Sequence, residues 1–534
     1  QEKKIFAVQG PYPVIRRLLR ARGWVERKFP RMGRARSQPE QEHGSQAKQL
    51  QGEKEEEELC SEDHDVIHNL MSRLVQDQVP YFIWTNRCSA VNCQLLRQDQ
   101  VLNHYARVGT FATKEGLCLS LRNLPWFDQA DPNTFFPRCY RLGAADERQA
   151  FIEDFCQTAA RSLLKMALER AGDTLTRTEQ SLKSGECPDE GHVSHPMPST
   201  VGPGPLVHSQ LVEEALQVCG QHLGSLEHQD IDEDLLSSCT MGTDWDCFLR
   251  DYYHVVHKGA GLTLSRAQWK RCQTLLGCLA ERLPQLGMEG DHNIWILKPG
   301  AKSRGRGIVC TARLEEVLQL AQGCTALSAR AGEWVVQKYV ERPLLIFGTK
   351  FDIRQWFLVT DFNPLTVWFY RESYLRFCSQ PFSLHHLDPA RHLCNVSIQK
   401  WFRPAQDQHP QLPSDRIWSC QQFQKYLTQV GRADAWHQVM VPGMKAAVVG
   451  ALRSAQDLVE SRKGSFELYG ADFLFGEDCQ PWLLEINASP TMAPSSVVTS
   501  RLCARVQRDT LRVVIDRRNN PDCPTGAFEL IYKE

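Results

Sequence analysis

Residues 472–487 read Asp472-Phe-Leu-Phe-Gly-Glu-Asp-Cys-Gln-Pro-Trp-Leu-Leu-Glu485-Ile-Asn487, two apolar runs joined by a short polar segment. A tight turn centred on residues 478–479 predicts a β-hairpin in which Phe475 faces Trp482 and Asp472 faces Glu485. Because like charges directly opposite each other are destabilising, this pair of carboxylates needs a positively charged partner.

Three oxygen-bearing side chains of this hairpin are predicted to lie together. Side chains alternate between the two faces of a strand, so we expect related faces to carry the side chains of Asp472, Leu474, Leu483, Glu485 and Asn487. Carboxylate and amide oxygens are the ligands that Mg²⁺ takes, usually together with nucleotide phosphates. An exposed hairpin with ordinary surface acids is the alternative. Since both strands are apolar at almost every other position, we expect them to be buried, which favours a magnesium site at Asp472, Glu485 and Asn487.

Length and composition indicate a large intracellular protein. A chain of 534 residues exceeds what one core usually serves, so two or three domains are expected. The 20 cysteines show no Cys-x-x-Cys pair, which favours reduced thiols and a cytoplasmic location. We find no signal peptide and no apolar run long enough to span a membrane. The chain begins with Gln1 rather than Met, so the sequence leaves open that it is a fragment.

Strand-like and helix-like segments alternate in the second half, which predicts an α/β protein. We expect an N-terminal α/β domain at 1–171 with a disordered acidic loop at about 31–65, a flexible linker at 172–205, a helical segment and central subdomain at 206–345, and a C-terminal subdomain at 346–534. Helices are expected at 13–22, 66–75, 151–170, 206–223, 265–282, 314–322 and 436–459.

A basic, glycine-rich loop follows the strand that ends at Lys298. It reads Gly300-Ala-Lys-Ser-Arg304-Gly305-Arg306-Gly307, and its backbone N–H groups and arginines are suited to phosphates. The loop is neither a Walker A loop nor a Rossmann fingerprint, because neither glycine spacing is present. A basic surface hairpin is the alternative.

Two further strands carry charged or polar residues among apolar ones. In 335–340, Gln337 and Lys338 interrupt an apolar run, and an adenine edge with the α-phosphate would supply their acceptors; a strand edge with Lys338 snorkelling outward is the alternative. Lys350, Asp352 and Arg354 alternate with apolar residues and therefore share one face, which suits ribose and phosphate or, alternatively, a solvated surface.

These motifs together resemble the tubulin tyrosine ligase-like family. They are, in the family's order, Lys298-Pro, Arg-Gly-Arg-Gly, Gln-Lys-Tyr-Val, Lys-Phe-Asp-Ile-Arg, Asn-Val-Ser-Ile-Gln-Lys and Trp-Leu-Leu-Glu-Ile-Asn. The match covers roughly residues 293–500, and the segment from Lys350 to Phe369 resembles the family's glycine-ligase branch. Upstream pieces such as Asn123-Leu-Pro-Trp-Phe-Asp are similar to chain-initiating tubulin monoglycylases. The resemblance implies an ATP-grasp fold.

The resemblance also implies the roles of individual residues. The ATP contacts would be Lys298, Arg304, Gly305, Gln337, Lys338, Tyr339, Val340, Lys350, Phe351, Asp352, Cys394 and Asn395. Mg²⁺ would be held by Asp472, Glu485 and Asn487, with Glu485 and Arg376 as catalytic residues. Arg376 and Ser397 would lie near the incoming amino acid.

The implied activity is ATP-dependent attachment of glycine to glutamate side chains in acidic tubulin tails. Glutamate-adding relatives commonly have Thr and His where this chain has Cys394 and Ala488, and the uncharged pair suits a donor without a side-chain carboxylate. A glutamate ligase of the same fold and a non-catalytic microtubule-binding protein are the alternatives. The intact set of Asp472, Glu485 and Asn487 argues against the non-catalytic one.

The expected partner is a flexible acidic tail. Residues 1–36 carry eleven Lys and Arg, including Arg16, Arg17 and Arg20 of an expected helix, and would complement such a tail. This stretch lacks a nucleic-acid-binding motif and interleaved aromatic residues, so we expect no nucleic acid as partner. We expect a monomer that acts on microtubules in the cytoplasm and in cilia.

Overall fold

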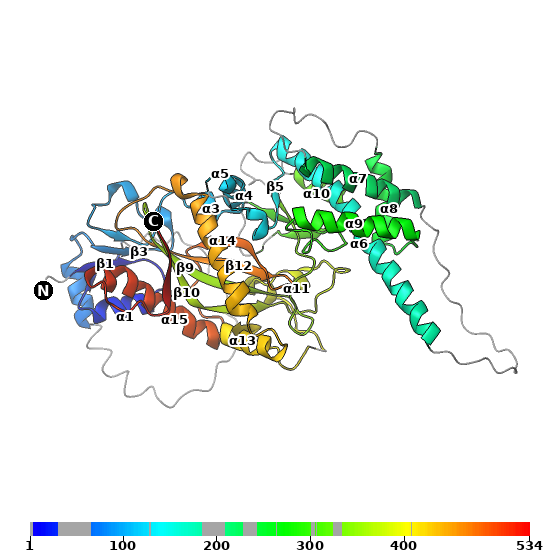
Figure 1. Cartoon of the computed structure of the whole chain (residues 1–534). Helices are drawn as coiled ribbons and strands as arrows, with labels where there is room; N and C mark the ends of the chain where they lie inside the picture. The colour runs from blue at the N-terminus through cyan, green and yellow to red at the C-terminus, as the bar shows by residue number, and fades with distance from the viewer. Residues whose placement is uncertain are drawn as a thin grey trace.

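The structure is a computed structural model that describes residues 4–29, 66–127, 130–183, 209–227, 243–262, 264–300, 305, 307–323, 334–406 and 408–534. Three β-sheets follow one another along the molecule, and a group of helices covers the end farthest from the N-terminus (Figure 1). This mixed α/β architecture agrees with the predicted class. The predicted acidic loop at 31–65 lies outside the described residues.

The first sheet consists of four short parallel strands. Their order is β2 (Val25–Glu26), β1 (Ile5–Val8), β3 (Phe82–Trp84) and β4 (Val101–Leu102). Helix α1 (Pro13–Ala21) connects β1 to β2 and buries Ile15 and Leu19, as its apolar spacing predicts.

The arginines of α1 do not form an open basic surface. Arg16 and Arg20 both pair with the buried carboxylate of Glu26, at 2.8 and 2.9 Å. Arg22 pairs with Asp516 near the C-terminus at 2.5 Å. The predicted role of Arg16 and Arg20 in capturing an acidic tail is therefore wrong, because their charges are used within the fold, whereas for the exposed Arg17 it stays a prediction.

The second sheet is antiparallel and carries the helical group. Its order is β5 (Cys139–Arg141), β8 (Trp334–Lys338), β6 (Trp295–Pro299) and β7 (Val309–Thr311). The helices are α6 (Ala145–Lys183), α7 (Ser209–Glu227), α8 (Trp245–Val256), α9 (Arg266–Arg282) and α10 (Leu314–Gly323). Sheet and helices share one core, in which Trp295 packs against Phe151 and Phe155.

The predicted domain boundary at residue 171 does not coincide with a break in this fold. β5 precedes the boundary and pairs with β8, while α6 runs across it without interruption. Because no proline occurs between Ala145 and Pro188, the helix continues to Lys183 into the segment predicted as a linker. Residues 184–205 of that segment lie outside the described residues.

The third sheet is the largest and also antiparallel. Its order is β11 (Ile417–Ser419), β10 (Leu365–Phe377), β9 (Phe351–Phe362), β12 (Glu467–Phe475) and β13 (Pro481–Ala488), and β14 (Phe528–Lys533) also pairs with β10. Alternate residues of β9 enter two different cores. Phe357 and Val359 pack with α14 (Val441–Arg453), whereas Trp356 and Leu358 pack with α15 (Val497–Leu511) and the first sheet.

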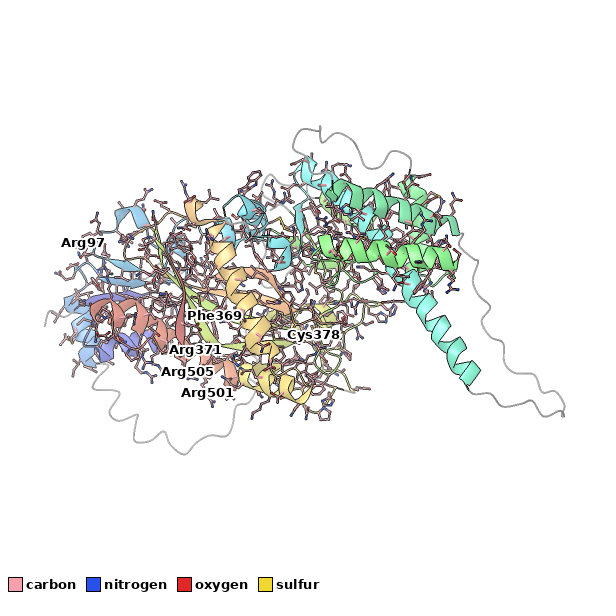
Figure 2. The ribbon with its side chains drawn as sticks, viewed as in Figure 1. Arg97, Phe369, Arg371, Cys378, Arg501 and Arg505 are labelled. Atoms are coloured by element: carbon pink, nitrogen blue, oxygen red, sulfur yellow. A yellow bond between two sulfur atoms is a disulfide. The ribbon has the colours of Figure 1, made fainter. Side chains whose placement is uncertain are left out.

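Shorter helices connect these layers. They are α3 (Gly109–Ala112), α4 (Lys114–Arg122), α5 (Leu124–Phe127), α11 (Pro389–His392), α12 (Val396–Gln399), α13 (Cys420–Gln429), a π-helical turn (Trp436–Met440) before α14, and α16 (Arg517–Asn519). Helix α15 is fixed to β10 by an ion pair of 2.8 Å between Arg505 and Glu372, close to Arg371 (Figure 2).

The cysteines were expected to be reduced, and no membrane span was expected. A disulfide links Cys118 of α4 to Cys139 of β5, so the expectation of reduced thiols is wrong for this pair. The bond ties α4 to the second sheet. Among the described helices, none is both long enough and apolar enough to cross a membrane.

The decisive hairpin is β12 and β13. Asp472 lies opposite Glu485 as predicted, but Leu474 lies opposite Trp482 and Phe475 opposite Pro481. The predicted Phe475–Trp482 pair is wrong by one position, because a β-bulge between Asp472 and Phe473 inserts one extra residue into β13.

Candidate active site

A cavity lies between the second and the third sheet. The predicted residues that line it are Lys298, Gly305, Gln337, Lys338, Tyr339, Val340, Lys350, Asp352, Cys394, Asn395, Asp472 and Glu485. Segments that lie almost 190 residues apart in the sequence therefore line the same cavity.

The β-bulge decides which leucine faces this cavity. Leu483 is buried in the core below the sheet, while Leu484 lines the cavity beside Leu474. The prediction that Leu483 shares a face with Glu485 is wrong, since the extra residue reverses the side on which the following side chains project.

Charged side chains form a row across four neighbouring strands. Arg376 of β10 lies opposite Asp352 of β9, and Arg354 of β9 lies opposite Asp472 of β12. Asp472 in turn lies opposite Glu485 of β13. The alternation of charges on β9 therefore serves a buried site rather than a solvated face.

Ion pairs connect the members of this row. Arg376 donates to both oxygens of Asp352 at 2.6 and 2.7 Å, and Arg354 donates to both oxygens of Asp472 at 2.5 and 3.0 Å. Arg376 Nη2 also lies 3.0 Å from Asp472. Gly470 makes room for this network, because a Cβ there would lie 2.9 Å from Cδ of Arg354.

The two buried acids respond differently to their surroundings. Burial opposes the charge of Asp472, but Arg354 and Arg376 outweigh it and hold the pKa of this carboxyl well below its usual range. Burial raises the pKa of Asp352, although Arg376 acts in the opposite direction. Asp472 is therefore ionised at neutral pH.

The predicted metal ligands meet at one point. Asn487 Nδ2 lies 3.2 Å from Glu485 Oε1 and 3.5 Å from Asp472 Oδ2. Turning this amide over would present its oxygen, which gives three hard donors suited to Mg²⁺. Lys114 Nζ lies 3.9 Å from Glu485 Oε2, so positive side chains now accompany both carboxylates. The donor set fits a divalent cation.

Lys298 enters the cavity from β6. Its ammonium group donates to Gln337 Oε1 at 2.6 Å and to the carbonyl of Leu484 at 3.3 Å. Burial lowers the pKa of Lys298 to about 8, although nearby Glu485 acts in the opposite direction. An additional anion such as a phosphate would raise this pKa again, because it favours the charged form of the lysine.

Lys338 does not require an acceptor from a nucleotide, so this prediction is wrong. Its ammonium group donates to Glu341 at 2.7 Å and to the carbonyl of Ile294 at 2.8 Å. Gln337 likewise donates to the carbonyl of Pro137 at 2.8 Å. Lys338 borders the cavity, but protein acceptors already satisfy its charge.

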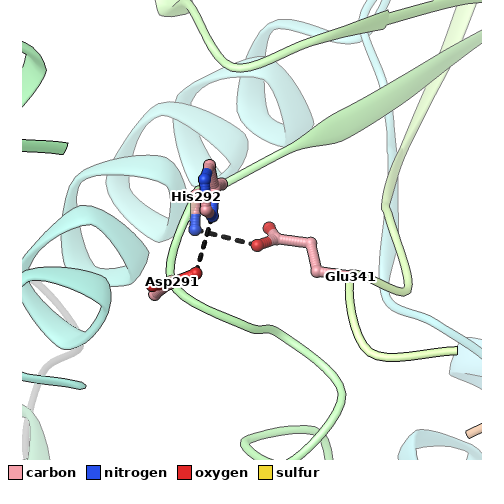
Figure 3. A group of neighbouring side chains, drawn as sticks. All are labelled: Asp291, His292 and Glu341. Carbon is pink, nitrogen blue, oxygen red and sulfur yellow. Dashed lines mark hydrogen bonds and ion pairs between the residues drawn. The ribbon is translucent and has the colours of Figure 1, made fainter. Parts of the chain in front are cut away.

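Glu341 belongs to a small group with Asp291 and His292 (Figure 3). The three residues are close enough to hold one metal ion, yet Glu341 already accepts from the backbone N–H groups of His292 and Ile294 at 2.8 and 2.7 Å and from Lys338. We therefore assign this group a structural role beside β8.

Lys350 is held by a short chain of hydrogen bonds. It donates to the hydroxyl of Tyr339 at 2.6 Å, and this hydroxyl lies 2.6 Å from His392 Nδ1. Burial lowers the pKa of His392 to about 4, so this ring is neutral at pH 7. Its Nε2–H then donates to the carbonyl of His386, and Nδ1 accepts from Tyr339. Lys350 is thereby fixed at the cavity wall.

The glycine-rich loop approaches the opposite wall closely. Gly305 has a positive φ of 73°, and a Cβ there would lie 2.1 Å from Cδ1 of Ile398 and 2.9 Å from Oδ1 of Asn395. This position therefore requires glycine. Cys394, the neighbour of Asn395, lies with its sulfur 3.5 Å from that of Cys378, which Figure 2 labels. Such a cradle fits a nucleotide phosphate.

Five predicted residues do not line the cavity or are not described. Asn487 is one of them, although its amide contacts Glu485 of the cavity wall. Phe351 points into the core below the third sheet. Ser397 is half-buried in α12, and the buried Arg376 holds Asp352 and Asp472 through Nε and Nη2. Arg304 lies outside the described residues.

Comparison with known proteins decides the family. The family model described as "Tubulin-tyrosine ligase family" matches residues 245–523. Tubulin monoglycylase TTLL3 of Mus musculus is 54% identical over the whole of this chain, which covers 59% of that protein. The human TTLL3 is 51% identical, with 65% of its length covered, and protein monoglycylase TTLL8 of Mus musculus is 46% identical, with 64% covered.

The chain belongs to the tubulin-tyrosine ligase family. Membership implies an ATP-grasp-like fold and the use of ATP, which agrees with the charged cavity between two sheets. The chain spans about three fifths of the length of mouse TTLL3, and its identity to that protein extends upstream of the part that the family model matches.

Residues that sequence reasoning missed fall into three groups. Ile296, Ile308, Leu393 and Leu484 add apolar walls to the cavity, and apolar residues carry no signal that separates a core from a ligand site. Lys114 lies upstream of the matched part, and no local pattern links it to Glu485. His392 could have been predicted from the sequence, because it stands two residues before Cys394, which was predicted to contact ATP.

Proposed function

We propose that this chain is an ATP-dependent ligase with an ATP-grasp fold that attaches glycine to the γ-carboxylate of glutamates in acidic tubulin tails and so initiates glycine branches. The observation that carries the proposal is the charged row from Arg376 to Glu485 at the edge of a cavity rich in lysine. The names of its relatives support glycine and tubulin.

The proposed reaction has two steps. The γ-carboxylate of the acceptor attacks the γ-phosphate of ATP and releases ADP, and the amine of glycine then displaces phosphate from the acyl-phosphate to form an isopeptide bond. Lys298 and Lys350 would bind phosphates, and Gly305 would let the loop backbone approach them. Mg²⁺ held by Asp472, Glu485 and Asn487 would neutralise phosphate charge.

Arg376 would bind the α-carboxylate of the donor. Its Nε and Nη2 hold Asp352 and Asp472, and none of its contacts with described residues uses Nη1. The remaining N–H groups are directed donors for one carboxylate. Ser397, in the turn after Asn395, would lie at the edge of the same subsite.

The preference for glycine rests on Cys394 rather than on Ala488. Ala488 packs against the core below the third sheet, on the opposite side of β13 from Asn487, so the prediction that it faces the donor is corrected. Cys394 lines the cavity and offers no charge to a second carboxylate. The relatives named monoglycylases favour the same donor.

We expect glycine to be used and glutamate to be refused by at least about a hundredfold in kcat/KM, because an unpaired carboxylate in a closed site costs several kcal/mol. Purified protein is offered ATP, Mg²⁺, an acidic tubulin-tail peptide and an equal mixture of both amino acids, and the mass added to the peptide is read. Alanine serves as the control for size without charge. Incorporation of glutamate at a comparable rate would establish the alternative, a glutamate ligase.

The setting of this activity follows from its substrate. We propose that the chain acts on microtubules of the cytoskeleton, including those of cilia, and works as a monomer without a nucleic-acid partner. Tubulin is named as the substrate of the relatives. Co-sedimentation with microtubules, before and after removal of the tails, tests this partner.

A further inference from the structure

His392 of α11 stands at one end of a row of three polar side chains. Its Nδ1 lies 2.6 Å from the hydroxyl of Tyr339, and this hydroxyl lies 2.6 Å from the ammonium nitrogen of Lys350. All three residues are buried, and all of them line the cavity. His392 is therefore linked by hydrogen bonds to a lysine that would bind phosphate in the proposed reaction.

The donors and acceptors of this row allow a single direction. The ammonium group of Lys350 can only donate, so the Tyr339 oxygen accepts its hydrogen bond. The O–H of Tyr339 then needs an acceptor of its own, and His392 Nδ1 lies within reach. Because Nδ1 accepts only when it carries no proton, the proton of the neutral ring lies on Nε2.

Two carbonyl groups select the same tautomer from the other side of the ring. His392 Nε2 lies 2.7 Å from the oxygen of His386 and 3.1 Å from the oxygen of Ser383. Carbonyl oxygens cannot donate, so the opposite tautomer would place a lone pair against both of them. Burial, and then the charge of Lys350, lower the pKa of His392 to about 4, which keeps the ring neutral at pH 7.

The surroundings of His392 hold the ring in one orientation. Gln399 Nε2 donates to the carbonyls of Pro389 and Leu393, which bracket this turn of the chain, at 3.0 and 2.6 Å. The ring of Phe382 packs against the imidazole, with 5.5 Å between the ring centres. A close-packed ring of this kind is a rigid support for the hydrogen bond to the next side chain.

Lys350 depends on this row for its direction. Among the described residues, its ammonium group donates to the Tyr339 hydroxyl alone, and it lies 4.3 Å from the centre of the same ring. A lysine has a flexible four-carbon stem, so its partners decide where its N–H groups point. Without an acceptor at residue 392, the O–H of Tyr339 would lose its partner and the direction of Lys350 would no longer be fixed.

We propose that His392 is a positioning residue for nucleotide binding: its unprotonated Nδ1 holds the Tyr339 hydroxyl, and this hydroxyl directs the ammonium group of Lys350 toward the phosphates of ATP. The inference deepens the proposed function and rests on it, because it needs a nucleotide in the cavity. His392 acts through Tyr339 and Lys350 rather than on a reacting atom. It therefore strengthens the binding of phosphate groups and not that of the adenine base.

The test compares His392→Leu, which has no acceptor, with His392→Asn, whose amide oxygen can take the place of Nδ1. We expect His392→Leu to raise the Kd of the Mg²⁺ complex of a non-hydrolysable ATP analogue about tenfold and His392→Asn to stay within about threefold of the wild type, because the amide restores the acceptor. The Kd of adenosine, which has no phosphate, should change less than about twofold in both variants. Damage to the cavity would weaken adenosine as well, so calorimetry with both ligands separates positioning from a structural role.

A control and a second background sharpen this comparison. Burial also lowers the pKa of His222 to about 4, but this ring contacts Arg161 in the helical group and does not line the cavity, so His222→Leu should leave both affinities unchanged. In a chain that carries Lys350→Met, the further change His392→Leu should cost less than about twofold, because the residue through which it acts is absent. Additive losses in this double variant would overturn the proposal.

Tyr339→Phe keeps the proposal testable if His392→Leu does not fold. It removes only the hydroxyl that links the two residues, so we expect the same loss for the ATP analogue, about tenfold, and the same affinity for adenosine. In spectra of the chain with ¹⁵N-labelled histidine, the ring that responds to Tyr339→Phe should have an unprotonated Nδ1 at pH 7. A proton on this nitrogen, or equal losses for the analogue and adenosine, would overturn the role of His392.

The remaining outcomes separate the two levels of inference. If the wild type binds the ATP analogue but adds no glycine, the proposed function fails, while the comparison of Kd values still decides on His392. If the wild type adds glycine and the folded variants bind the analogue as tightly as it does, only the role of His392 fails. If the wild type binds no nucleotide, both are overturned.

Discussion

Glu485→Gln is expected to reduce ligation by about a hundredfold or more while leaving the fold unchanged, because the amide keeps the shape but loses the charge that Mg²⁺ requires. The Glu485 side chain is 26% exposed, and it contacts Lys114 and accepts a hydrogen bond from Asn487. The fold therefore depends little on its charge.

The measurement combines a ligation assay with thermal unfolding. Glu477→Gln is the matched control, since Glu477 forms an exposed pair with Arg342 on the turn of the same hairpin. We expect both variants to melt within about two degrees of the wild type, as surface substitutions of this kind do. Ligation near the wild-type rate in folded Glu485→Gln would remove this residue from the metal site.

Asp472→Asn is expected to abolish ligation and also to destabilise the fold by about 3 kcal/mol. The residue is 2% exposed on its side chain and holds two guanidinium groups, Arg354 at 2.5 Å and Arg376 at 3.0 Å. Removing one partner of a buried ion pair leaves an uncompensated charge, which costs about 3–5 kcal/mol. Asp472 thus combines a metal-binding and a structural role, in contrast to Glu485.

Urea unfolding of Asp472→Asn, Arg354→Met and the double variant measures this coupling. We expect the double variant to lose less stability than the sum of the two single variants, because the second substitution removes the unpaired charge. Since the pKa of Asp472 is held well below its usual range, its contribution is present above the unfolded pKa of about 4 and is lost only as the pH falls through the lower folded pKa. Additive losses would show that the ion pair carries no coupling.

The two substitutions together separate chemistry from folding. Both acids were predicted from one hairpin, and the sequence assigned them the same role. Their surroundings differ, because Asp472 faces β9 and its arginine whereas Glu485 faces the edge of the sheet. We therefore expect the stability of the chain to respond to residue 472 and hardly to residue 485, although ligation responds to both.

The sequence by itself determined features that depend on local periodicity. The pairing of Asp472 with Glu485 and the common face of Asp352 and Arg354 follow from the alternation of side chains along a strand, which is fixed by the backbone. The α/β class and α1 follow in the same way from apolar spacing. These features need no knowledge of distant residues.

Only the tertiary structure decided which partner each polar group has. Lys338 is satisfied by Glu341 rather than by a nucleotide, and Arg16 by Glu26 rather than by a tail. Lys114 meets Glu485 across 371 positions. A buried charge takes the nearest partner in space, and burial and proximity arise only when the sheets have assembled. The same reason applies to the β-bulge, whose single extra residue brings Leu484 to the cavity. The sequence does not specify the position of this residue, because Leu483 and Leu484 fit the apolar pattern equally well.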